Sequence, residues 1–200
     1  PTFDLMLGTP IDKCKLNGDE FISLSHKFNG TRCAFVNGKL MTRQGKEYIG
    51  LDHIINEISE LNLSDYFIDG ELIYKNEEGL SDSEAFQKGT GIAMSKDTDK
   101  SSLKLVIFEI FKPSNSNLNY SMRSKNLIKF NEQLSEVKHV EFLTPLYQGY
   151  DHSQIWKWLD YAEENDWEGI MINLDTPYEF KRTKNLIKVK KFHSCDIRCV

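Results

Sequence analysis

Four short segments of the chain carry side chains suited to phosphate chemistry. The first, S-H-K-F-N-G-T-R at 25–32, places a lysine close to a glycine turn and an arginine. A segment with two carboxylates, a second acidic segment and a pair of lysines follow in order: F-I-D-G-E-L at 67–72, W-E-G-I-M-I at 167–172 and L-I-K-V-K at 186–190. Together they suit a lysine that attacks a nucleotide phosphate while cations and a metal neutralise the charge.

Lys27 is the candidate nucleophile of this set. An amine attacks phosphorus only in its neutral form, which nearby positive charge favours. Lys188 and Lys190 are two residues apart, so they project from the same face of a strand while Val189 turns to the other side. Two cations on that face would stabilise the charge that develops on an α-phosphate. Taken alone, a K-x-K pair is more often a solvated strand edge.

Two carboxylates, Glu71 and Glu168, are candidate ligands for a metal or a sugar, and the role of a third, Asp69, is left open. Asp69 and Glu71 share one face of their strand, and Glu71 could hold a ribose hydroxyl or a metal. Glu168 precedes a glycine that admits close backbone approach, and it could hold a metal as well. Mg²⁺ usually takes one or two carboxylates together with phosphate oxygens and water, and this set supplies them. Without the other segments, D-G-E-L would be interpreted as a turn leading into an apolar strand.

An aromatic residue and two arginines complete the candidate set. Phe108 lies inside an apolar run, so its default interpretation is a core residue and its alternative role is to stack on a purine base. Arg32 and Arg43 lie in hairpin segments from which they could reach phosphate or sugar, although an exposed surface arginine is the default for each.

These residues need strands to hold them in place. E-F-I-S-L-S alternates with period two before the lysine motif, and T-R-C-A-F-V after it predicts a second strand. Asn37-Gly38 follows and is the strongest local signal for a hairpin. A helix at 51–61 and a strand at 66–74 come next, with a turn at 76–79. Residues 75–101 are rich in Gly, Ser and Asp and predict a long irregular loop.

The second half of the chain predicts further elements of both kinds. Residues 103–111 form a nearly continuous apolar run, typical of a strand buried on both faces. Two helices are expected at 121–137 and 151–165, the second opened by a capping box that starts at Asp151, and two strands at 169–174 and 186–192. The predicted fold class is α+β, with antiparallel sheets and flanking helices in one domain that spans 1–200.

Composition describes a globular protein of 200 residues and 23.2 kDa with 40% hydrophobic and 28% charged residues. No apolar run approaches the length of a membrane span and no signal-peptide pattern opens the chain, so we expect an intracellular protein without a membrane partner.

Four cysteines are too few for a disulfide scaffold, and H-S-C-D-I-R-C at 193–199 lacks the second pair of a zinc site. The net charge is −5, but residues 180–193 hold six Lys/Arg and no Asp or Glu, which is either a basic strip for phosphates or a solvated terminal segment.

The motifs resemble those of the nucleotidyltransferase (adenylation) domain of ATP-dependent DNA ligases, especially the small phage and viral type. Lys27 to Arg32 stands in the place of the family's K-x-D-G-x-R. T-R-Q-G at 42–45 is similar to its arginine-bearing hairpin, and D-G-E-L at 69–72 to its third motif. V-I-F-E at 106–109 matches its aromatic strand, and E-G-I-M-I at 168–172 and L-I-K-V-K match the last two motifs.

The resemblance implies an ATP-grasp-like ligase fold and a three-step reaction. Lysine takes AMP from ATP, AMP passes to the 5′-phosphate of a nick in duplex DNA, and the 3′-hydroxyl displaces AMP to seal the strand. It implies Lys27 as the nucleophile, Arg43 as a contact of the nick phosphate, and Glu168 and Glu71 as ligands of Mg²⁺ or Mn²⁺. The implied nucleotide contacts are Ser25, His26, Arg32, Glu71, Phe108, Lys188 and Lys190.

Two departures from the family pattern bear on activity. Asn29 stands where the family has aspartate, so the negative charge of that position is missing. The chain also stops soon after the last lysine motif, so we expect the family's following OB-fold domain to be absent from this chain and to be its partner in the native, monomeric protein. An RNA ligase, which tolerates variation within K-x-x-G, a capping guanylyltransferase and a catalytically silent binding module are the alternatives.

Overall fold

The computed structural model describes residues 4–134 and 139–190, which form two compact units. Unit 1 consists chiefly of Asn29–Asn117 and Met122–Thr144. Unit 2 consists of Leu5–Phe28, Leu118–Ser121 and the chain from Pro145 onward. The boundary between Phe28 and Asn29 therefore falls inside the lysine motif. The C-terminal cysteine segment at 193–199 lies outside the described residues.

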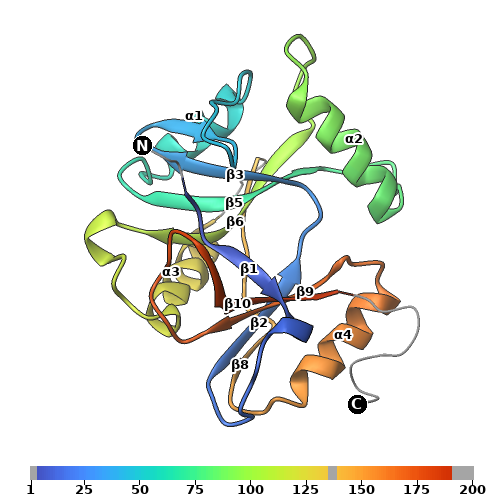
Figure 1. The fold of residues 1–200 in the computed structure, drawn as a ribbon. Coiled ribbons are helices and arrows are strands. Elements are labelled where there is room, and N and C mark those ends of the chain that lie inside the picture. Colours follow the sequence, from blue (N-terminus) through green and yellow to red (C-terminus); the bar gives the residue numbers. More distant parts are fainter. Residues whose placement is uncertain (1–3, 135–138, 191–200) are drawn as a thin grey trace. The chain divides into compact units, whose positions relative to one another are not determined.

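Unit 1 is built on a five-stranded sheet of order β4-β3-β5-β6-β7 (Figure 1). Its pairs are antiparallel except for β6 and β7, which run parallel. Asn37 and Gly38 join β3 to β4 with φ of 51° and 78°, so the predicted hairpin is confirmed. The strands are β3 (Thr31–Val36), β4 (Lys39–Met41), β5 (Phe67–Tyr74), β6 (Leu103–Phe111) and β7 (Val140–Phe142).

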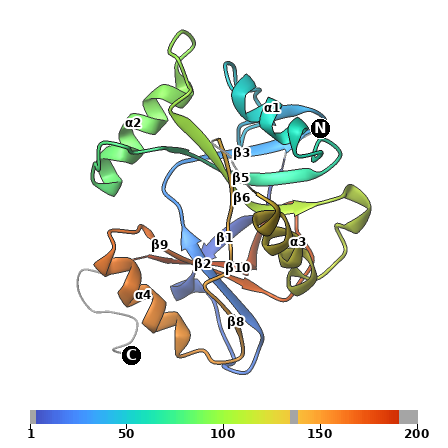
Figure 2. The same ribbon diagram turned by 180° about the vertical axis from the view of Figure 1, so that it is seen from behind.

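Helices cover this sheet and close its core. Ile54 and Ile58 of α1 and Leu127 of α3 join the buried cluster formed by β3, β5 and β6. Phe130 of α3 packs on Phe142 of β7, and Figure 2 shows this helix from behind. The helices are α1 (Asp52–Glu60), α2 (Asp82–Met94) and α3 (Tyr120–Gln133), with a 3-10 turn at Pro113–Asn115. No helix of the described residues is long and apolar enough to cross a membrane.

Helix α2 corrects the prediction of an irregular loop over 75–101. Ser81 caps its first turn by accepting a hydrogen bond from Glu84 N at 3.2 Å, and Asp82 and Glu84 place negative charge at the N-terminus. Gly89 lies against Tyr74 of β5, where an added Cβ would be 3.2 Å from the Tyr74 Cβ. Ser81 therefore serves capping and Gly89 close packing, and the S-x-x-E capping box was the signal that identifies the helix.

Unit 2 is built on a second five-stranded sheet, of order β1-β10-β9-β2-β8. Only β1 and β10 pair in parallel. The amphipathic helix α4 (Gln154–Glu164) packs its buried Ile155, Leu159 and Ala162 against Ile170 and Ile172 (Figure 1). The strands are β1 (Leu7–Pro10), β2 (Ile22–Lys27), β8 (Tyr147–Gly149), β9 (Gly169–Leu174) and β10 (Arg182–Lys190), with a 3-10 turn at Ile11–Lys13.

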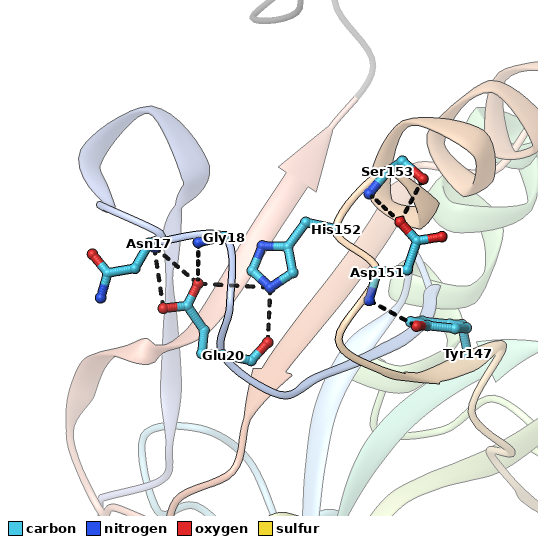
Figure 3. A network of polar contacts seen from close by, with 7 residues as sticks. All are labelled: Asn17, Gly18, Glu20, Tyr147, Asp151, His152 and Ser153. Atoms are coloured by element: carbon cyan, nitrogen blue, oxygen red, sulfur yellow. Dashed lines mark hydrogen bonds and ion pairs between the residues drawn. The ribbon is translucent and has the colours of Figure 1, made fainter.

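A polar network joins the turn before β2 to the start of α4 (Figure 3). Glu20 accepts hydrogen bonds from the backbone N–H groups of Asn17 and Gly18, and His152 Nε2 lies 2.8 Å from the Glu20 carbonyl. Asp151 accepts from Ser153 N at 3.1 Å and from Ser153 Oγ at 2.6 Å. The helix α4 begins at Gln154, and its N-cap residue is Ser153, which makes no side-chain cap hydrogen bond. The capping box predicted at Asp151 is therefore wrong, because this carboxylate holds the turn before the helix instead.

Candidate active site

Lys27 lies at the end of β2, directly beside the start of β9. Its ammonium Nζ is 2.9 Å from Glu168 Oε2, and the two side chains are 16% and 21% exposed. Lys27 is the register partner of Gly169. A Cβ at Gly169 would lie 2.1 Å from the Val189 carbonyl oxygen, so only glycine lets β9 and β10 approach here. The glycine of the E-G-I-M-I segment therefore allows the close pairing of β9 with β10 next to Glu168.

Lys190 reaches the same carboxylate from the other side of β9. Its Nζ is 3.5 Å from Glu168 Oε1, so one carboxylate lies between two ammonium groups. The Lys190 side chain is 57% exposed, so this second ion pair contributes only roughly 0–1 kcal/mol to stability. The arrangement gathers two ammonium groups around one carboxylate at the candidate nucleophile.

The register of unit 2 places four of the predicted residues on one face of the sheet. Directly paired residues point to the same side of a sheet. The row Lys27, Gly169, Lys190 and the neighbouring row Ser25, Met171, Lys188 therefore share a face. Val189 is fully buried on the opposite face. The prediction that Lys188 and Lys190 project together is confirmed, and the structure brings Ser25 and Lys27 to the same side.

His26 lies on the face opposite to Lys27, with Ile170 and Val189 as its row partners. Its ring is stacked between Phe28 and Trp167, with centroid distances of 3.9 Å and 3.8 Å. Burial in this stack lowers the pKa of the imidazole to about 4. Both ring faces are covered, so this placement gives no support to the predicted nucleotide contact of His26. The period of two along β2 was the signal that separates it from Ser25 and Lys27.

Unit 1 holds a bidentate ion pair between Arg32 and Asp69. Arg32 Nε and Nη2 lie 2.7 Å and 2.5 Å from the two carboxylate oxygens, and the Asp69 side chain is fully buried. Glu71 is the register partner of Arg32, so Asp69 and Glu71 share a face of β5 as predicted. Tyr48 donates a hydrogen bond to the Arg32 carbonyl at 2.8 Å. Asp69 therefore fixes the direction of the Arg32 guanidinium.

Phe108 occupies a β-bulge in β6. Asp69 pairs with Glu109 and Gly70 pairs with Ile107, which leaves Phe108 as the extra residue between them. Its two neighbours are buried, whereas Phe108 is only partly buried and is absent from the core cluster. The Arg32 guanidinium carbon is 5.1 Å from the centre of its ring. The default interpretation as a core residue is therefore wrong, because the bulge turns this ring out of the core.

A second ion pair joins Glu109 of β6 to Arg123 of α3. Arg123 Nε of α3 is 2.7 Å from Glu109 Oε1, with the arginine side chain fully buried. Burial raises the pKa of the Glu109 carboxyl, and the hydrogen bond and charge of Arg123 oppose this rise. Glu109 is also the register partner of Asp69. The carboxylates of the two arginine pairs thus lie on neighbouring strands, Asp69 on β5 and Glu109 on β6, and the pair of Glu109 with Arg123 was not predicted from the sequence.

The remaining predicted residues lie at the edges of unit 1. Arg43 is exposed in the turn formed by T-R-Q-G, where Gly45 N donates to the Thr42 carbonyl at 2.9 Å. Asn29 Nδ2 donates to Asp82 Oδ2 at 3.1 Å. Asp82 was not among the predicted residues, since it lies in the segment expected to be a loop.

The candidate metal ligands fit a phosphate-bound cation rather than a closed protein site. Among the described residues, no group of three or more His, Cys, Asp and Glu side chains could enclose a metal. Glu168 offers one partly exposed carboxylate in unit 2, and Glu71 offers another in unit 1. Mg²⁺ is commonly held by one or two carboxylates with phosphate oxygens and waters, so these donors suit Mg²⁺ that arrives with a nucleotide.

The fold defines a nucleotidyltransferase domain of the ligase type. The family model described as "ATP dependent DNA ligase domain" matches residues 6–190, so the chain belongs to that family. This confirms the resemblance and the α+β fold predicted from the sequence.

Several solved structures share the fold at low sequence identity. Pmar-Lig_Pre has a TM-score of 0.78 and 23% identity, with 96% of this chain and 47% of that chain covered. Chlorella virus DNA ligase-adenylate has a TM-score of 0.70 and 18% identity, with 94% and 68% covered. The bacteriophage T7 ATP-dependent DNA ligase in complex with ATP has a TM-score of 0.64 and 15% identity, with 92% and 67% covered. The chain spans about half the length of Pmar-Lig_Pre. No curated protein sequence matches the chain significantly.

Proposed function

We propose that this chain is the adenylation domain of an ATP-dependent DNA ligase with Lys27 as its nucleophile. Lys27 takes AMP from ATP, and AMP then passes to the 5′-phosphate of a nick that the 3′-hydroxyl seals. The observation that carries this proposal is the contact of Lys27 with the Glu168 carboxylate at 2.9 Å, on the sheet face that also carries Lys188 and Lys190. Membership in the ligase family supports the choice of ATP and DNA as substrates.

The first step requires Lys27 to lose a proton. The Glu168 carboxylate is within hydrogen-bond distance of the ammonium and can accept it. The neutral amine then attacks the α-phosphorus of ATP: a P–N bond forms, the bridging P–O bond breaks, and its electron pair leaves with pyrophosphate. Lys188 and Lys190 share the face of Lys27, so their charges would stabilise the negative charge that develops on the α-phosphate oxygens.

Residues of unit 1 are proposed to recognise the nucleoside. Phe108 is turned out of the core by its bulge and would stack on adenine, and the Arg32 guanidinium supports its ring. Arg32 and Glu71 would contact the sugar. Glu168 and Glu71 would hold Mg²⁺ or Mn²⁺, which supplies further neutralisation of phosphate charge when it is bound.

Nicked duplex DNA is the proposed polymeric substrate, and an OB-fold domain of the same native, monomeric protein is the proposed partner. Exposed Lys181, Arg182 and Lys184 of the basic strip and Arg43 would contact phosphates. These few contacts predict weak binding with a shallow salt dependence, at a log–log slope of about −0.9 per phosphate. We expect slow sealing from ATP and faster sealing of a pre-adenylated nick, and appending the OB-fold domain should restore binding and sealing together.

Intact-mass measurement after incubation with ATP, GTP and Mg²⁺ tests the proposal. We expect one acid-labile AMP adduct, which peptide mapping places on Lys27 and which Lys27→Ala abolishes. Lys39→Ala is the matched control, since Lys39 is 61% exposed on β4 and is outside the proposed site. A GMP adduct would indicate a capping enzyme, an adduct on Lys188 or Lys190 would contradict the assignment, and no adduct would favour the silent module.

A further inference from the structure

Asn29 and Asp82 form a side-chain pair in unit 1 at the position where the chain departs from the lysine motif of its family. Asn29 stands two residues after Lys27, where K-x-D-G-x-R has aspartate. Its amide Nδ2 donates to Asp82 Oδ2 at 3.1 Å, and both side chains are half-buried. Hydrogen bonds to a carboxylate are stronger than those between neutral groups. Position 29 therefore has no charge of its own but contacts a charge supplied by α2.

The backbone that carries Asp82 is held in place by its own hydrogen bonds. Asn76 Nδ2 donates to the Leu80 carbonyl at 2.9 Å, and Leu80 N donates to Asn76 Oδ1 at 2.7 Å. Ser81 then caps α2 through Glu84 N. Asp82 is the first residue of the helix, so the backbone position from which its side chain extends is fixed.

The other member of the pair is fixed by the glycine that follows it. A Cβ at Gly30 would lie 2.1 Å from the Leu72 carbonyl oxygen, so the chain after Asn29 lies directly against β5. The short distance between Asn29 and Asp82 is thus a product of two constrained segments, 53 residues apart in sequence.

We propose that Asp82 supplies the negative charge that the family's aspartate supplies at position 29, and that Asn29 positions this carboxylate. The inference rests on the proposed function. The pair carries a single charge, as the family's aspartate does alone. Two carboxylates about 3 Å apart cannot both ionise readily, so the presence of Asp82 explains why an amide is accommodated at position 29.

Four chains test this inference: the parent, Asp82→Asn, Asn29→Asp, and the double variant in which amide and carboxylate change places. Two rates are measured, formation of the lysyl-AMP adduct and joining of a pre-adenylated nick. Asp82→Asn removes the charge while an amide remains to hydrogen-bond with Asn29, so we expect at least one rate to fall about tenfold, or about 1.4 kcal/mol, with the unfolding temperature preserved. The double variant should recover to within about threefold of the parent.

The pH profile of Asn29→Asp separates a charge effect from a structural one. Its two carboxylates should share a proton more readily at low pH, so its rate relative to the parent should rise as pH falls from about 8 to about 6. Asp65→Asn, at an exposed position of unit 1, is the matched control.

The possible outcomes are distinct. If the parent is active and both rates of Asp82→Asn are within about twofold of the parent's, the role of Asp82 is overturned and the proposed function is left intact. A folded double variant as slow as Asp82→Asn would also overturn it. A parent that forms no adduct and joins no nick would overturn the proposed function, and this inference with it.

Discussion

The buried imidazole of His26 makes the stability of the protein depend on pH in a defined window. The ring has an ordinary pKa of 6.5 when unfolded and about 4 in its stack between Phe28 and Trp167. The unfolded chain therefore binds more protons between these values, so the folded state loses stability as pH falls from 6.5 to about 4. At about 1.4 kcal/mol per pH unit, the full loss is about 3 kcal/mol, of which about 2 kcal/mol is reached at pH 5.

Urea unfolding of the parent and of His26→Phe at pH 7.5 and pH 5 measures this effect. Phenylalanine keeps an aromatic ring in the stack but cannot be protonated, and effects of other groups such as Glu109 cancel in the difference. Unfolding is followed by tryptophan fluorescence. Between pH 7.5 and pH 5, we expect the free energy of unfolding of His26→Phe to rise by about 2 kcal/mol relative to that of the parent. A difference between the two proteins that does not change with pH would refute the reasoning.

Three further predictions concern packing and charge. Arg123→Met leaves the Glu109 carboxylate buried without its partner, so urea unfolding should show a loss of about 3–5 kcal/mol, while Lys125→Met on the same helix should cost little. Gly169→Ala forces β9 and β10 apart, so the thermal midpoint and adduct formation should fall together; an unchanged midpoint would contradict the close approach to Val189. Phe108→Leu removes a partly buried ring that lies outside the core cluster, so ATP affinity measured by calorimetry should fall about tenfold with little loss of stability, and an unchanged affinity would exclude base stacking.

Local patterns predicted the parts of the structure that depend on neighbouring residues. Asn37-Gly38 adopts the positive φ angles of a hairpin because those two residue types tolerate them. The spacing of Lys188 and Lys190 was sufficient to place both on one face, since the period of a strand does not depend on its partners. The order of the ligase motifs added what spacing alone could not, namely which distant segments belong to one site.

Features that depend on pairing between strands could not be predicted. The bulge at Phe108 exists only in the register of β5 against β6, so no pattern within 103–111 distinguishes this ring from its buried neighbours. The ion pair between Glu109 and Arg123 joins a strand to a helix, and neither residue type indicates its partner. The short strands β1, β7 and β8 have three or four residues each, too few for a period to be recognised.

The discontinuous path of unit 2 has a consequence for how the protein is made. Its sheet pairs β1 with β10 and β2 with β9, and contacts such as that of Thr9 with Thr183 join residues 174 apart in sequence. Loop closure over such distances is costly and slow, whereas unit 1 draws its strands from a nearly continuous stretch. During synthesis, Lys27 leaves the ribosome before the strands of unit 1 and meets Glu168 only when β9 has been added. The Lys27 ammonium therefore acquires its charged surroundings only after the strands of unit 1 have been made.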